Sequence, residues 1–208
     1  MKKIFLVIVI GTLVQCLQAQ TSKKIMLPTG WSLSPAGSSL SLGDLPLNMA
    51  VSKSKKLMAV TNNGQSTQSI QLINLTNNSI VDNIKIEKSW LGIAFSADEK
   101  YLYASGGNDN WILKYSTEHQ KLKLIDSIKL GDKWPHKISP AGLCINDAKS
   151  ILYVVTKDDS CLYEINLKTN KIIKKTALPA EGYTCVLSKD QSELYISVWG
   201  AAQLVVRS

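Results

Sequence analysis

The side chains best suited to chemistry are few and scattered in this sequence. Its 208 residues include two histidines, His119 and His136, and four cysteines. The cysteines and histidines lack the short spacings typical of metal sites, and no Cys-x-x-Cys pair occurs. No Gly-x-Ser-x-Gly segment presents a nucleophilic serine. We therefore predict that this chain contains no catalytic residues, no metal and no cofactor.

Two acidic and amide-rich segments could supply oxygen ligands to calcium, which needs six to eight of them. They are Asn108-Asp109-Asn110 and Asp158-Asp159. Both fall between predicted strands at matching places in a repeat, and Asn and Asp tolerate the positive φ that tight turns require. We interpret them as turns.

The elements that would position such groups repeat along the chain. Four stretches each contain an apolar strand, a short polar turn and a second alternating strand; they are residues 49–62, 93–107, 142–157 and 184–200. Aligned on Leu57, Leu102, Leu152 and Leu194, the repeats lie 45, 50 and 42 residues apart. A repeat of this length without helical patterning is typical of β-propeller blades.

A third and a fourth predicted strand follow most of these pairs, so each unit has four short antiparallel strands. The sequence predicts an all-β fold, a β-propeller with blades at about 45–86, 90–130, 138–178 and 182–208, after a lead-in segment at 20–44. Because residue 208 falls in the third strand of its blade, about three and a half blades are present. We expect a truncated seven-bladed propeller; the alternative is a compact four-bladed ring that borrows a lead-in strand.

The N-terminus is predicted to be a secretory signal peptide covering residues 1–19. Lys2 and Lys3 precede an apolar run from 4 to 14, and Ala19 is a small residue at the expected cleavage site. The run is too short to span a bilayer. We expect export to the periplasm or beyond the cell, with no membrane span; lipid anchoring at Cys16 is the less favoured alternative, because the bulky Gln15 precedes it.

Removal of this segment changes two counts. The net charge falls from +8 to +6, carried by dispersed lysines without an aromatic platform, so we predict no nucleic-acid binding. Three cysteines remain, Cys144, Cys161 and Cys185. One disulfide plus one free thiol, or buried thiols that act as small apolar side chains, are both compatible with this odd number, and the pairing stays open.

Residues 45–64 and 90–107 resemble the repeat of YVTN/YncE-type bacterial β-propellers, which belong among the WD40-like repeat proteins. The paired Gly-His and Trp-Asp signature of WD40 repeats proper does not recur. Residues 27–52 and 137–143 resemble exported two-part proteins in which such a propeller precedes a phosphoesterase domain of the alkaline phosphatase superfamily. The resemblance implies a C-terminal phosphoesterase domain as partner. That domain needs a binuclear metal cluster, which two histidines cannot supply.

The loops that lead into the innermost strand of each blade are expected to meet at one mouth of the central channel. They place Asn48, Trp90, His136 and Tyr183 as candidate ligand contacts. Alternatively, Trp90 and Tyr183 wedge adjacent blades apart and His136 is merely solvated.

These observations predict an exported, non-catalytic propeller segment that binds a small-molecule or protein ligand and accompanies a phosphoesterase. Two alternatives stay open. One is a propeller enzyme of the lactonase or quinoprotein-like type, and the other is a surface scaffold or adhesion module.

Overall fold

The computed structural model describes residues 25–33, 37–133 and 135–208. The predicted signal peptide and Cys16 lie outside the described residues. The chain divides into two units at residue 40. In the first, strands β1 (Ile25–Met26) and β2 (Ser32–Leu33) form a short antiparallel hairpin.

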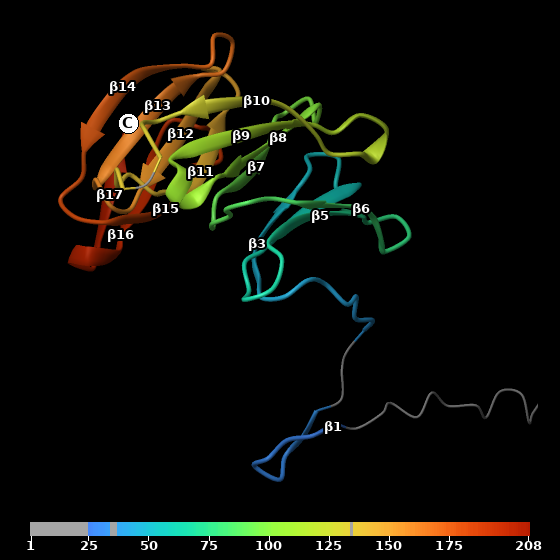
Figure 1. Ribbon diagram of the computed structural model, residues 1–208. Helices are drawn as coiled ribbons and strands as arrows, with labels where there is room; N and C mark the ends of the chain where they lie inside the picture. The colour runs from blue at the N-terminus through green and yellow to red at the C-terminus, as the bar shows by residue number, and fades with distance from the viewer. Residues whose placement is uncertain (1–24, 34–36, 134) are drawn as a thin grey trace, which may run out of the picture. The chain divides into compact units, whose positions relative to one another are not determined.

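The second unit, residues 41–208, is all-β and contains four antiparallel sheets that follow one another in chain order (Figure 1). Blade 1 consists of β3 (Pro46–Val51), β4 (Leu57–Asn62), β5 (Ser69–Asn74) and β6 (Ser79–Lys85). Blade 2 consists of β7 (Ile93–Phe95), β8 (Tyr101–Ser105), β9 (Trp111–Ser116) and β10 (Lys123–Lys129). Blade 3 consists of β11 (Pro140–Asn146), β12 (Ile151–Thr156), β13 (Cys161–Asn166) and β14 (Lys171–Ala177). Blade 4 has three strands, β15 (Gly182–Leu187), β16 (Leu194–Val198) and β17 (Gln203–Arg207).

Each sheet is a simple meander, and the first strands β3, β7, β11 and β15 contact one another in succession. This arrangement is a β-propeller with four blades, so the predicted all-β propeller of four-stranded antiparallel blades is confirmed. The described residues include no helix that is long and apolar enough to cross a membrane.

The strand register refines the alignment of the repeats. Phe95 pairs with Leu102, Ile145 with Leu152, and Leu187 with Leu194. The corresponding pair in blade 1 is Val51 with Met58, one position later than Leu57. Leu57 instead corresponds to Tyr101, because the backbone N–H of Ser52 bonds to the Leu57 carbonyl as that of Ser96 bonds to Tyr101.

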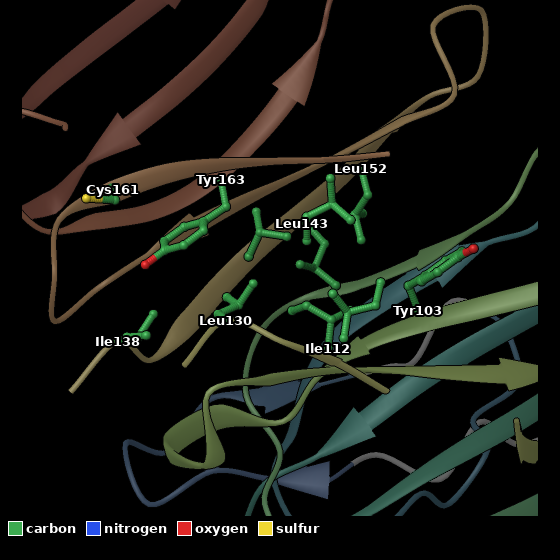
Figure 2. Close-up of a cluster of buried hydrophobic side chains, with 11 residues drawn as sticks. Tyr103, Ile112, Leu130, Ile138, Leu143, Leu152, Cys161 and Tyr163 are labelled. Carbon is green, nitrogen blue, oxygen red and sulfur yellow. The ribbon is translucent and has the colours of Figure 1, made fainter. Parts of the chain in front are cut away.

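The hydrophobic core lies between neighbouring blades. The largest cluster joins blades 2 and 3, and Figure 2 shows Ile112 of blade 2 beside Leu143 and Leu152 of blade 3, with Tyr103 on the far side of Ile112. Similar clusters join blades 1 and 2 and blades 3 and 4. Each blade is therefore stabilised by burial of apolar surface against the next.

The turn between the first two strands of each blade also contacts the turn of the neighbouring blade. The Glu99 carboxylate accepts hydrogen bonds from the backbone N–H and hydroxyl of Ser54, and the first of these lowers the pKa of Glu99. Asp147 accepts from the N–H of Ala97, and the Gln191 carbonyl from the side chain of Asn146. Non-glycine residues take positive φ in all four turns, namely Lys55, Glu99, Ser150 and Gln191. In each turn a residue with a side chain therefore adopts a backbone conformation that usually favours glycine.

Candidate ligand-binding site

A polar pocket of about 210 Å³ lies where loops from blades 1, 2 and 3 converge. Two kinds of loop contribute: those that lead into an innermost strand, and the hairpins between the second and third strands. Because the strands of a blade alternate in direction, both kinds fall at the same end of the sheet. The lining residues are Asn63, Gln68, Lys88, Ser89, Trp90, Gly107, Asn108, Ser139, Lys157 and Asp158.

The pocket wall between blades 1 and 2 is fixed by amide side chains. Asn63 donates from Nδ2 to the Ser89 carbonyl at 2.6 Å, and Gln68 accepts from the Ser89 N–H at 2.7 Å. Gly107, at a φ of 54°, approaches closely, since a Cβ there would lie 3.2 Å from the Ser89 carbonyl oxygen. The segment that carries Ser89 and Trp90 is therefore held from both neighbouring hairpins.

The wall toward blade 3 depends on Asn110, which is fully buried. Its Oδ1 accepts from the backbone N–H groups of Ile138 and Ser139, at 3.2 and 2.9 Å. Its Nδ2 donates to the carbonyls of Asp132 and His136, both at 2.6 Å. The Ser139 hydroxyl lies within hydrogen-bonding distance of both the Asn108 and the Asp158 side chains. The amide of Asn110 thus anchors the segment that leads into β11.

Three residues that line this pocket each have a buried polar side-chain atom without a hydrogen-bond partner among the described residues. The atoms are Oδ1 of Asn63, Oγ of Ser89 and Nε1 of Trp90. Ser89 is only 6% exposed. A buried polar atom without a partner costs about 1–3 kcal/mol, so an unmatched acceptor, hydroxyl and N–H on neighbouring lining residues single out this pocket as the candidate site for a polar molecule.

The charge of the pocket is set by the side chains of Lys88, Lys157 and Asp158. Neither lysine forms an ion pair with another described residue. The Asp158 carboxylate already accepts from Ser139. The arrangement therefore provides hydrogen-bond donors, one free amide acceptor and ammonium groups that suit an anion.

The structure places the four residues expected at the channel mouth in different surroundings. Trp90 lines the pocket. Asn48 does not, but its side chain donates to the Leu91 carbonyl at 2.7 Å, next to Trp90. His136 is exposed, and only its carbonyl contacts Asn110. Tyr183 packs edge-on against Trp199, with ring centroids 5.4 Å apart, beside an apolar hollow on blade 4.

The sequence interpretation missed Asn63, Ser89 and Lys157 as individual contacts. Asn63 directly follows the predicted two-strand stretch 49–62 and Lys157 ends the stretch 142–157, so the pattern predicts only turns at these positions. The strand order of a blade could have indicated them, because the hairpin between its second and third strands lies at the same end of the sheet as the loop that leads into its first strand.

A second polar cluster lies on blade 3 around Asp159. Its carboxylate accepts from the Tyr163 hydroxyl at 2.6 Å and lies 3.0 Å from the Lys175 ammonium. Burial, and then the bond to Asp159, raise the pKa of Tyr163 to about 12. The hydrogen bonds to Tyr163 and Asp159 raise the pKa of Lys175. Since these groups satisfy one another, the cluster stabilises the blade and offers no unmatched group. Within the described ranges no three His, Cys, Asp or Glu side chains are grouped as metal ligands.

Comparison with known proteins identifies the fold alone. No family model and no curated protein sequence matches the chain. Among solved structures, the chain is similar to hydrazine synthase of Kuenenia stuttgartiensis, with 14% identity and a TM-score of 0.61 over 82% of this chain and 47% of that one. It is similar to the WD40 repeats of RRP9, with 12% identity and a TM-score of 0.59 over 80% of this chain and 52% of that one.

A third similar structure is a functionally unknown protein from Desulfotomaculum acetoxidans, with 12% identity and a TM-score of 0.64 over 88% of this chain and 60% of that one. The chain spans about half the length of the first of these structures. Together they show that the chain has a WD40-like propeller fold.

Proposed function

We propose that this chain is a propeller segment that binds a small hydroxylated anion in the pocket lined by Ser89 and Trp90. The observation that carries the proposal is the group of three buried, unmatched polar atoms beside two lysines. A carboxylate or similar anion matches the ammonium groups, the Trp90 N–H and the Ser89 hydroxyl. A hydroxyl group on the same ligand supplies the donor that Asn63 Oδ1 lacks.

Calorimetry and thermal unfolding with D-gluconate, and with sorbitol as a neutral polyol of similar size, test this proposal. Gluconate is expected to bind and to raise the melting temperature, whereas sorbitol binds at least tenfold more weakly. Trp90→Phe keeps the ring and removes the N–H, and Lys157→Gln removes one charge; each is expected to weaken gluconate binding about tenfold, the effect of about 1.4 kcal/mol.

Lys100→Gln is the matched control, because Lys100 is an exposed lysine outside the pocket. Equal gluconate affinity in the wild type, Trp90→Phe and Lys157→Gln would contradict the proposal. Absence of binding at millimolar gluconate would mean that water alone satisfies the three atoms.

The sequence supports two wider elements of this proposal. The signal-like residues 1–19 support export; fractionation of expressing cells and N-terminal sequencing are expected to find a mature chain that begins at Gln20 outside the cytoplasm. Recovery of the uncleaved chain, with Met1 intact, from the cytoplasm would refute export.

The YncE-type resemblance of residues 45–64 and 90–107, and that of residues 27–52 to two-part exported proteins, support association with a phosphoesterase domain. We expect the reading frame downstream of Ser208 to encode such a domain. The 208-residue chain itself is expected to show no turnover of a generic phosphate ester with divalent metals. Chelator-sensitive turnover would contradict the non-catalytic role.

A further inference from the structure

The contact between blades 3 and 4 carries two thiols where the other contacts carry aliphatic side chains. In the strand register, Cys144 of β11 pairs with Tyr153 as Ala94 of β7 pairs with Tyr103. Cys185 pairs with Ile196 as Leu143 pairs with Val154. The small residue of one blade thus faces the larger residue of the next, and at this junction both positions are cysteine.

The two sulfur atoms are already in contact. Cys185 donates from Sγ to the Sγ of Cys144 at 3.2 Å, and Cys185 is buried whereas Cys144 is half-buried. Gly142 lets the strands come this close, since a Cβ there would lie 2.4 Å from the Cα of Thr184. A disulfide needs its sulfurs about 2 Å apart, so a shift of roughly one ångström would suffice.

We propose that Cys144 and Cys185 form a disulfide that covalently joins the innermost strands of blades 3 and 4. The remaining described cysteine, Cys161, is not a partner, because it is the first residue of β13 and donates to the Asp159 carbonyl at 3.1 Å. The pairing depends on the thiol geometry alone and is independent of the ligand pocket.

The reaction requires a two-electron oxidant, for which a small-molecule disulfide such as oxidised glutathione suffices. The thiolate of the more accessible Cys144 attacks one glutathione sulfur and releases a glutathione thiolate, leaving a mixed disulfide. The thiolate of Cys185 then attacks the Cys144 sulfur and releases the second glutathione thiolate. Two protons leave the protein thiols, and the two electrons reduce the glutathione disulfide.

The surroundings of Cys185 control the second step. Its hydrogen bond to Cys144 and its burial raise the pKa of Cys185. Since the thiolate is the nucleophile, ring closure is expected to accelerate as the pH rises above neutrality.

Peptide mapping of the full chain tests the pairing directly. The folded protein is incubated with oxidised glutathione, alkylated under denaturing conditions and digested with trypsin without reduction. Cleavage after lysine separates Cys144 (peptide 138–149), Cys161 (158–168) and Cys185 (176–189). We expect the first and third peptides to be recovered as one linked species and the second as a singly alkylated peptide.

Thermal unfolding with and without reductant supplies a second readout. Closing a loop between residues 41 apart should raise the melting temperature of the oxidised chain by about 10 °C. Cys161→Ala is expected to retain this difference. Cys144→Ala with Cys185→Leu, which copies the residues of the preceding junction, is expected to fold and to lose it; Cys144→Ala alone is the alternative should the double variant fail to fold.

Recovery of Cys144 and Cys185 as separate alkylated peptides from oxidised, folded protein would overturn the proposal. So would a link from either residue to Cys161 or to a second chain. A linked peptide without a reductant-dependent melting temperature would overturn the expected stabilisation of the junction.

Discussion

The three junctions between neighbouring blades share one backbone arrangement but are held by different chemistry. At the first two, Ala50 and Ala94 pack into clusters that contain Ile93 and Leu143, respectively. At the third, Cys144 meets Cys185. The close approach of the first strands is common to the second and third junctions, where Gly92 and Gly142 leave room for the neighbouring backbone.

The polar contacts at the first two junctions also differ from those at the third. Gln68, Asn110 and Ser160 are equivalent, because the carbonyl of each accepts from the first residue after the fourth strand of its blade. The side chains of Gln68 and Asn110 bind the segment leading into the next blade, whereas Ser160 makes no such bond within the described residues. The third junction therefore lacks the amide contact at this position, although Asn146 of blade 3 donates to the Gln191 carbonyl of blade 4, and it has the pair of thiols in its first strands.

Replacement of the junction glycines, Gly92 and Gly142, should have the largest effect on the stability of the junctions. A Cβ at position 142 would lie 2.4 Å from the Thr184 Cα, and one at position 92 would lie 2.3 Å from the Ala141 carbonyl oxygen. Backbone atoms cannot rotate away, so Gly142→Ala and Gly92→Ala should each lower the free energy of unfolding by at least about 3 kcal/mol.

Urea denaturation of reduced protein measures this loss. Only Gly142→Ala should also slow disulfide formation, because it separates β11 from β15. A change below about 1 kcal/mol in both variants would mean that the strands are further apart than described.

Removal of the amide side chains should have the next largest effect. Asn110→Gly keeps the left-handed backbone accessible and leaves four backbone groups without their partner, which should cost about 3 kcal/mol. Gln68→Ala leaves the single Ser89 N–H unpaired and should cost about 1 kcal/mol. Equal losses in the two variants, measured by chemical denaturation, would contradict the difference between these junctions.

Alkaline pH should produce the smallest effect per side chain, about 1 kcal/mol for each buried tyrosine at pH 11. Burial raises the pKa of Tyr103 and of Tyr115 to about 12. Because the folded-state pKa exceeds the unfolded value, the contribution to stability is complete below about pH 10 and is lost as the pH rises through 12.

Denaturation at pH 9, 10 and 11, with tyrosinate absorbance followed in parallel, checks this dependence. Tyr103→Phe is expected to flatten the alkaline decline, whereas Tyr195→Phe should change it less, because a hydrogen bond to Glu193 rather than burial is the main cause that raises the pKa of Tyr195. An unchanged stability from pH 9 to 11 would contradict the expected ionisation.

The blades could be predicted from the sequence because their signal is local and repeated. Strand alternation and polar turns recur around Leu102, Leu152 and Leu194 and define four sheets. The one-residue shift at Met58 could not be predicted, because Leu57 and Met58 are both apolar and hydrophobicity alone does not fix the register.

The pocket could be predicted only in part. The loop that contains Trp90 could be predicted from the strand pattern. The hydrogen-bond partners of Ser89, such as Asn63, are distant in sequence, and their contact with Ser89 depends on how the blades pack. The contact between Cys144 and Cys185 likewise joins positions 41 residues apart, and an odd number of cysteines gives no pairing.

The turn-to-turn contacts of Glu99, Asp147 and Gln191 connect each blade only with its immediate neighbour. Stability in such an array is approximately a sum of blade and nearest-neighbour terms. Blades 2 and 3 have neighbours on both sides, so their amides in β8, β9 and β12 should exchange with solvent most slowly. Folding is then expected to start within this central pair and to extend outward one blade at a time.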